Sequence, residues 1–309
     1  MRLTVAILLV CVTGALVRAD EVAPATYELH ESWQKDFVYT IDESETVDST
    51  TVFQVPQKDG GKQRVSGGVT DKHERVLDCT PVAFDDKGAT KLHFTVLKHT
   101  LLRHELPPGE AAARQTHNGQ GPFTGAEWDE DWKTDHWKRA LTKAATSQFG
   151  QFPDELMKAM RAKRYTRQHY MLPTGAVTEG ATWKPDATHL LEQFKQFQRQ
   201  PDAPELEIEC KLESVKDGRA VLSLKWKAEK LLPVKGDTGS DWKAGASVTI
   251  EGTAILTLHL ADQFVEKFDS ETTARLEGDL WNSGSWLPAE ATLKCSRVVA
   301  TTRKKVEPK

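Results

Sequence analysis

The sequence contains little cysteine, with four residues in a chain of 309. Cys11 lies in an apolar N-terminal stretch, which leaves Cys79, Cys210 and Cys295 for the rest of the protein. An odd and sparse set is no disulfide framework, so at most one bridge can form and the fold must depend on apolar burial. We expect no obligatory disulfide, and the sequence does not decide whether one forms among these three.

Runs of basic residues are also missing. The chain has 41 Lys and Arg against 45 Asp and Glu, which gives a net charge of −4. Proteins that bind nucleic acid or anionic lipid concentrate positive charge on one surface. The composition therefore predicts no nucleic-acid partner.

Sequence motifs for catalysis and metal binding are absent. There is no H-E-x-x-H, C-x-x-C, G-x-S-x-G or glycine-rich phosphate loop, and the acidic stretch 127–131 lacks the glycine of a calcium loop. His93 and His99 are expected on one strand face, too far apart to hold an ion without a third ligand. We predict no cofactor, no metal site and no catalytic residues. A hydrolase whose residues are dispersed in the sequence remains an alternative.

The N-terminus has the pattern of a secretory signal peptide. Arg2 precedes the apolar run from Leu3 to Val17, and small residues lead to a cut after Ala19. The run is short for a bilayer span, although a retained anchor is the alternative, and no later stretch approaches a span. We predict a secreted, periplasmic or envelope protein that is not integral to the membrane after cleavage.

The strongest pattern in the chain is the stretch from Val248 to Ala261. Its even positions, from Val248 through Leu256 and Leu258, are mainly apolar, while most odd positions are polar. Successive strand side chains point to opposite faces, so this pattern predicts one long strand with a dry and a wet face. Such a strand is typical of an antiparallel sheet covered on one side.

Three pairs of β runs around short turns predict hairpins. The turns are 85–88, 216–219 and 282–284, all of which contain glycine. Cys79 and Cys210 occupy matching places in the first two hairpins, which fits an internal duplication. The alternative is that any hairpin with an Asp and Gly turn has this appearance.

Other stretches predict turns, loops and helices. The acidic stretch 42–48 is turn-like, and 107–124 has the composition of a loop. Helical spacing predicts a helix from Trp128 to Ala145, a second from Asp154, and a third from Pro185 that carries an apolar stripe ending at Phe197. The expected fold is mainly β (α+β), a curved antiparallel sheet or half-barrel with a helical insertion. Its parts are the signal peptide 1–19, a β unit 20–124, the insertion 125–199 and a β unit 200–309, with the two β units in one continuous domain.

The chain has nine tryptophans, which are more often core anchors than exposed binding platforms. Three of them, Trp128, Trp132 and Trp137, fall on the first expected helix, where they could cover a groove beside the dry face of the long strand. The candidate surface for a ligand or partner is therefore these three residues with Leu256 and Leu258. The alternative is that the same tryptophans close the core and leave no groove.

A short segment carries a family resemblance. Pro173, Val177, Gly180 and Trp183 are spaced P-x-x-x-V-x-x-G-x-x-W, which resembles a segment of uncharacterised secreted bacterial β-rich proteins. Ala181 stands where that group usually has Asp, and the stretch 273–293 is similar to its closing hairpin. The resemblance implies secretion and antiparallel β structure but no substrate. The general shape is similar to lipoprotein-carrier half-barrels, which cradle acyl chains.

These observations favour a secreted, non-catalytic protein that binds an apolar ligand or a surface partner, such as one in a bacterial envelope. A structural component of the cell surface and the dispersed hydrolase are the two alternatives. A cavity of several hundred Å³ against the sheet would favour ligand binding.

Overall fold

A computed structural model describes residues 24–133, 136–143, 169–185, 197–199, 206–233, 242–243, 246–282 and 284–306. The predicted signal peptide lies outside these residues. All regular structure in the described part is β strand, and every strand pairing is antiparallel. None of the described segments is a helix of the length and apolarity that crossing a membrane requires.

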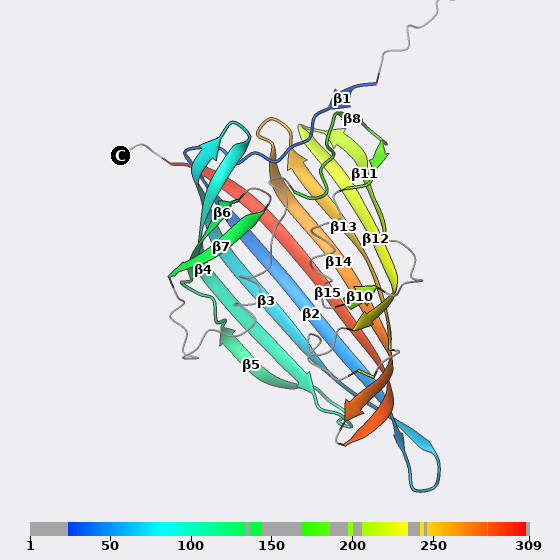
Figure 1. The fold of residues 1–309 in the computed structure, drawn as a ribbon. Coiled ribbons are helices and arrows are strands. Elements are labelled where there is room, and N and C mark those ends of the chain that lie inside the picture. The colour runs from blue at the N-terminus through cyan, green and yellow to red at the C-terminus, as the bar shows by residue number, and fades with distance from the viewer. Residues whose placement is uncertain are drawn as a thin grey trace, which may run out of the picture.

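Most of the chain belongs to one sheet of 13 strands (Figure 1). Its main order is β7-β6-β4-β3-β2-β15-β14-β13-β12-β11-β9, with β5 beside β4 and β10 beside β12. Two short strands, β1 and β8, pair with each other apart from it. The strands are β1 (Thr26–Tyr27), β2 (Phe37–Pro56), β3 (Lys62–Asp85), β4 (Gly88–Leu106), β5 (Arg114–Gln120), β6 (Glu127–Trp132), β7 (Trp137–Lys143), β8 (Val177–Thr178), β9 (Thr182–Trp183), β10 (Phe197–Arg199), β11 (Glu207–Lys216), β12 (Arg219–Pro233), β13 (Ser247–His259), β14 (Phe264–Asn282) and β15 (Ser285–Lys305).

The alternation predicted for Val248 to Ala261 is confirmed in β13. Val248 and Leu256 are fully buried, whereas Ile255 between them is 45% exposed. The buried side of β13 belongs to the face that we call the inner face of the sheet. The three predicted hairpins are also confirmed, as β3–β4, β11–β12 and β14–β15.

One predicted turn is strand instead, and one predicted loop contains a strand. The acidic stretch 42–48, predicted as a turn, lies in the middle of β2. Its inner-face carboxylates pair with arginines of the neighbouring strands, so acidic side chains do not end the strand there. The stretch 107–124, predicted as a loop, contains β5, which pairs with β4.

The predicted helix from Trp128 to Ala145 is wrong, because β6 and β7 form a hairpin there. Trp128 and Trp132 are four residues apart, a spacing that places side chains on one face of a strand as well as of a helix. Trp137 lies directly opposite Trp132 across the hairpin. The start of the predicted helix at Asp154 lies outside the described residues, as does most of the third, whose last stripe position, Phe197, belongs to β10.

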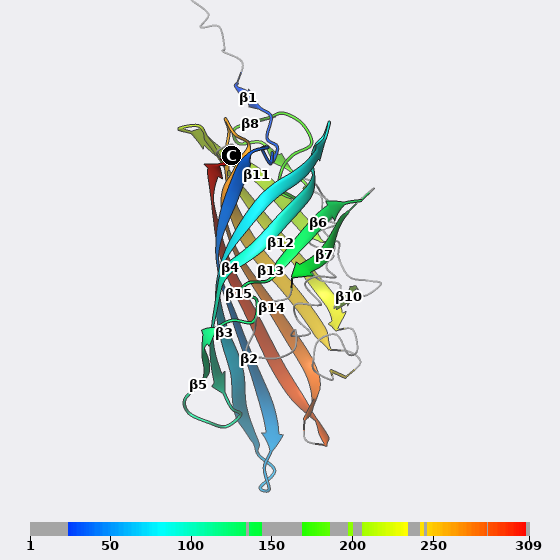
Figure 2. The same ribbon diagram turned by 90° about the vertical axis from the view of Figure 1, so that its left-hand side faces the viewer.

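The sheet is continuous across the two expected β units because β15 pairs with β2 along almost its whole length. It is also strongly curved. Arg139 of β7 and Trp226 of β12 line one cavity, although their strands are eight spacings apart in the sheet order. In a flat sheet eight spacings would be roughly 38 Å. Figure 2 shows the β6–β7 hairpin and β10 on the same side of the long strands.

Candidate functional site

The inner face of the sheet carries a cavity of about 480 Å³. Residues of β2, β15 and β14 line it, together with residues 31–33 and 169–170 and Arg139 of β7. Small-molecule sites in proteins span roughly 300–1,000 Å³, so the volume is that of a ligand site. The lining residues are Glu31, Ser32, Trp33, Tyr39, Ile41, Glu45, Phe94, Arg139, His169, Tyr170, Trp226, Phe264, Val265, Phe268, Ser270, Thr272, Cys295, Arg297, Val299 and Thr301.

One end of the cavity is aromatic. Tyr39 lies at its centre, with its ring 4.8 Å from that of Trp33 and 6.2 Å from that of Phe264, both edge to face. The Tyr39 hydroxyl accepts a hydrogen bond of 2.8 Å from the backbone N–H of Gln34. Burial raises the pKa of Tyr39, so the phenol is uncharged at neutral pH. This end is therefore an apolar wall whose rings are fixed by contacts with one another.

Trp226 lines the cavity from β12 and lies over Gly252 of β13. A Cβ on Gly252 would be 2.2 Å from Cζ2 of Trp226, so only glycine leaves room for the indole. Gly252 belongs to the even-numbered series of β13 that faces inward, and it is the one residue of that series without a side chain. Farther along this wall, the ring of His169 lies 5.1 Å from that of Phe268.

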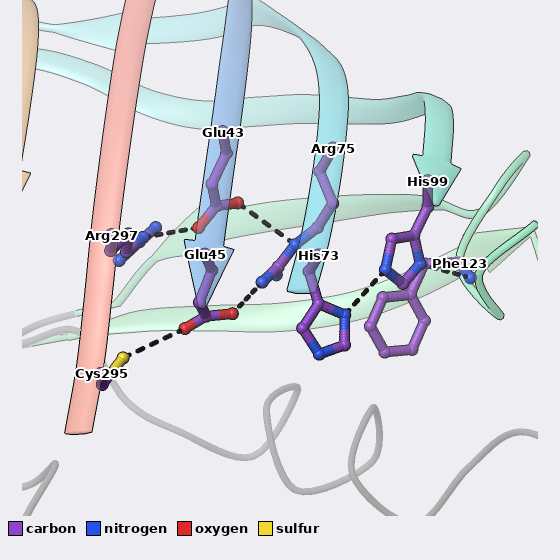
Figure 3. Close-up of polar contacts among 8 residues, drawn as sticks. All are labelled: Glu43, Glu45, His73, Arg75, His99, Phe123, Cys295 and Arg297. Carbon is purple, nitrogen blue, oxygen red and sulfur yellow. Dashed lines mark hydrogen bonds and ion pairs between the residues drawn. The ribbon is translucent and has the colours of Figure 1, made fainter. Parts of the chain in front are cut away.

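The other end of the cavity is polar and is built by alternation along neighbouring strands (Figure 3). Tyr39, Glu43 and Glu45 are odd-numbered residues of β2 and share the inner face. Arg297 of β15 lies directly opposite Glu45, and Arg75 of β3 lies directly opposite Glu43 on the other side. The regular pairing of β2 with both neighbours thus brings two carboxylates between two guanidinium groups.

These four side chains form an ion-pair network around the buried Glu43. Arg297 Nε donates to Glu43 Oε1 at 2.5 Å, and Arg75 Nε lies 3.5 Å from Glu43 Oε2. Arg75 also donates through a terminal nitrogen to Glu45 Oε2. Glu43 is only 8% exposed, and a buried carboxylate is tolerated when it is paired and hydrogen-bonded. The network ties β15, β2 and β3 together and has no net charge.

The charges of the network shift the pKa of Arg297, which belongs to it, and of the neighbouring Cys295. Burial would lower the pKa of Arg297, but Glu43 and Glu45 outweigh it and raise the pKa. Burial, with the charge of Glu45, raises the pKa of the Cys295 thiol to about 11. The thiol lies 3.8 Å from Glu45 Oε1 and is protonated at neutral pH. Since the thiolate is the reactive form, Cys295 is a poor nucleophile here.

A histidine pair extends the polar row onto β4. Nδ1 of His99 accepts a hydrogen bond of 3.2 Å from the backbone N–H of Phe123. The proton of a neutral His99 must therefore be on Nε2, which lies 3.1 Å from Nδ1 of His73 and donates to it. The ring of His99 also stacks on that of Phe123, with centroids 4.9 Å apart. Both nitrogens of His99 are thus committed in the neutral form.

Burial, reinforced by Arg75 and His73, lowers the pKa of His99 to about 3. The side chain is 1% exposed. Burial and Arg75 also lower the pKa of His73. A Cβ on Gly121 would lie 2.3 Å from His99 Nδ1. The backbone at residue 121 can therefore lie against the His99 ring only because this residue is glycine.

His93 and His99 lie on opposite faces of β4, which corrects the expectation that they share one. A β-bulge adds Leu97 between the pairs Leu77–Val96 and Val76–Lys98, and the extra residue reverses the alternation beyond it. His93 bonds Asp129 at 2.8 Å on the outer side. Among the described residues no three His, Cys, Asp or Glu side chains are grouped to hold a metal ion.

The five candidate residues lie next to the cavity rather than in its lining. Trp137 is buried beside Tyr39, with Trp128 and Trp132 packed against the same cluster. Leu256 and Leu258 are buried in a second cluster that contains Trp226 and Phe268. The structure therefore places the tryptophans and the leucines in two separate clusters. Each cluster also contains residues that line the cavity.

Sequence reasoning missed the residues of the polar end. A signal for two of them was present, since Glu43 and Glu45 continue the odd-numbered series of Tyr39 and Ile41. Nothing in the sequence indicates that Arg297 and Arg75 lie on either side of them, because that depends on the pairing of β2 with both β15 and β3.

Comparison with known proteins finds a likeness among solved structures. No protein-family model matches the chain, and no curated protein matches it significantly. A solved structure of lipovitellin, described by its lipid–protein interactions, aligns with 90% of this chain at 8% identity and a TM-score of 0.47. The chain spans 26% of the length of that protein. A likeness of this size establishes no shared activity, and the resemblance of the Pro173–Trp183 segment to secreted bacterial proteins stays a prediction.

Proposed function

We propose that this protein binds an apolar ligand, without catalysis, in the cavity on the inner face of its sheet. The observation that carries the proposal is the cavity of about 480 Å³ with its aromatic end. A cavity of about 150 Å³ can hold a benzene-sized molecule, so this one has room for a considerably larger ligand. About half of the lining residues are apolar or aromatic, and small-molecule sites combine such side chains with polar groups that fix the orientation of the ligand.

The state of the polar groups supports binding over catalysis. The Cys295 thiol is held protonated, and His99 uses both ring nitrogens in hydrogen bonds. Glu43 and Glu45 are engaged by Arg75 and Arg297. A general base or nucleophile needs an accessible reactive form, and these groups are instead used to hold neighbouring strands together.

The signal-peptide pattern and the Pro173–Trp183 resemblance support a location outside the cytoplasm. An exported protein meets envelope lipids, polymers and surface proteins, which are sources of apolar ligands and partners. We therefore propose a secreted or envelope location.

Binding of an uncharged fluorescent probe, N-phenyl-1-naphthylamine, tests the proposal. The probe should bind the wild-type protein, and Ser270→Phe should abolish binding because Ser270 lines the cavity. Glu271→Phe is the matched control, since residue 271 is the exposed neighbour on the outer face of β14 and should leave binding unchanged. Failure of the wild type to bind would contradict the proposal and favour the alternative of a structural cell-surface component. Equal effects of the two variants would place the binding elsewhere.

A further inference from the structure

We infer that the ligand is an amphiphile with a carboxylate head, bound with the head at Arg297 and the apolar tail among the rings around Tyr39. The inference rests on the proposed function, because it assigns the ligand class and orientation for the same cavity. It is carried by the position of Arg297 in the lining, away from the rings around Tyr39, and by the unequal use of Arg297 and Arg75, the two arginines of the ion-pair network.

Arg297 has hydrogen-bond donors that are not used within the described residues. Within the described part of the chain its hydrogen bond is made by Nε, to Glu43, and its two terminal nitrogens are left for other acceptors. The side chain lines the cavity and keeps 45% of its surface accessible. The planar edge formed by the terminal nitrogens matches a carboxylate, which it can bind through two parallel hydrogen bonds.

Arg75 differs from Arg297 in both respects. It contacts Glu43 through Nε and Glu45 through a terminal nitrogen, and its side chain is 22% accessible. Its contacts also answer the objection that Glu45 would repel an acidic ligand. Glu45 bonds Arg75 through Oε2, and the Cys295 thiol lies against Oε1, so both oxygens of this lining carboxylate already have partners.

Hydroxyl groups complete the head site. Ser270 of β14 lies directly opposite Arg297, and Thr272 lies opposite Cys295 in the next inner-face row. Both side chains line the cavity, and no hydrogen bond is made by their hydroxyls within the described residues. Hydroxyls can donate to a carboxylate, so the polar end offers donors from two strands to an acceptor-only head.

The tail end lies along β15 from this head site. Arg297, Val299 and Thr301 line the cavity in succession, and four residues of strand span roughly 13 Å. Ile41 and Phe268 flank this path, and Tyr39 and Phe264 stand near its far end. The path from Arg297 to the rings of Tyr39 and Phe264 gives the proposed orientation of the ligand, and its length suits a chain of medium length.

The test compares ligands of one tail and different heads on the wild-type protein. Decanoic acid, decan-1-ol and methyl decanoate are titrated against bound N-phenyl-1-naphthylamine at neutral pH. We expect the acid to compete at least about tenfold more strongly than the alcohol or the ester, because a charge-assisted hydrogen bond in a sheltered site contributes about that much. Equal competition by all three heads would overturn the inference and leave the proposed function standing. Absence of probe binding would overturn the proposed function itself.

Two variants locate the head. Arg297→Gln should reduce the affinity for decanoic acid by about tenfold and leave that for the uncharged probe. Arg297→Lys retains the charge and loses the planar guanidinium group, so its affinity for decanoic acid should lie between those of wild type and Arg297→Gln. This variant replaces Arg297→Gln in the test if that protein does not fold. Arg275→Gln is the matched control, because Arg275 lies on the outer face of the same sheet and pairs with Glu251. Loss of the acid preference in the control, or its survival in Arg297→Gln, would overturn the assignment.

Discussion

Nε2 of His99 donates a hydrogen bond to Nδ1 of His73 at 3.1 Å, and the direction of this bond follows from the backbone N–H that Nδ1 of His99 accepts. The pair is therefore built for uncharged rings, because a proton added to Nδ1 of His99 would face the N–H of Phe123. It stands beside Arg75 on the inner face, where a further positive charge would also be repelled.

The first prediction concerns stability at acidic pH. The pKa of His99 is about 3 in the folded protein and near 6.5 in the unfolded chain. Between these values the unfolded chain takes up a proton that the folded protein does not, so stability is complete above about pH 6.5 and falls as the pH decreases. The loss approaches about 1.4 kcal/mol per pH unit. Urea unfolding of wild type and His99→Gln between about pH 7 and about pH 4 measures it.

The variant should show a shallower loss of stability than wild type. His30→Gln is the control, because it changes an exposed histidine, and it should retain the wild-type dependence. Carboxylates contribute to acid unfolding in all three proteins, so the difference between proteins is the informative quantity. An unchanged slope in His99→Gln would show that His99 is protonated in the folded state.

The second prediction concerns the two faces of β13. Leu256→Asp places a charge among fully buried apolar residues, where an unpaired charge costs several kcal/mol or remains protonated. Ile255→Asp removes a similar aliphatic side chain at the adjacent position, which is 45% exposed, and should change stability by less than about 1 kcal/mol. Denaturant midpoints of the two variants compare them. Equal losses would mean that both faces of β13 are covered.

The third prediction concerns the contact of Gly252 with Trp226. Gly252→Ala adds a methyl group 2.2 Å from the indole, so either the ring or the strand must move. Overpacking of this kind costs about 1–3 kcal/mol, and displacement of Trp226 should also weaken binding of the apolar probe. Gly119→Ala in β5 is the control, since its nearest neighbour would be 4.0 Å away. A Gly252→Ala protein with wild-type stability and binding would contradict this packing.

The fourth prediction concerns the thiols. In the native protein Cys295 should be alkylated before Cys79 and Cys210, which are both buried. Its rate should rise with pH toward about 11, where the thiolate forms, and a ligand in the cavity should slow it. Mass spectrometry of unreduced, denatured protein should find all three alkylated. A bridged pair, or reaction of Cys210 ahead of Cys295, would contradict the structure.

Strand alternation was readable from the sequence wherever it depends on local pattern. The burial of Val248 and Leu256 and the exposure of Ile255 follow from the period of two alone. The same rule failed beyond Leu97, because one extra residue in a bulge reverses the face of every later side chain, including His99. Nothing in the local sequence marks that bulge, and the backbone of Val96 and of His99, on either side of it, forms hydrogen bonds with the distant segment 121–126.

The tryptophan spacing shows a second limit. A separation of four residues places Trp128 and Trp132 on one face in either a helix or a strand, and the pairing with β4 decides between them. The polar end of the cavity was beyond local reasoning for a related reason. Glu43 and Glu45 become a paired site only because strands from opposite ends of the sequence supply Arg75 and Arg297.

The pairing of β2 with β15 has a consequence for how the chain folds. Glu43 and Arg297 are 254 residues apart in sequence, so the middle of the sheet closes only after the residues between them have been synthesised. Contacts of such long range slow folding, since the entropy of closing the loop is lost before the contacts form. Until β15 emerges, the edge of β2 is open to pairing with another chain, which makes nascent and truncated forms of this protein prone to aggregation.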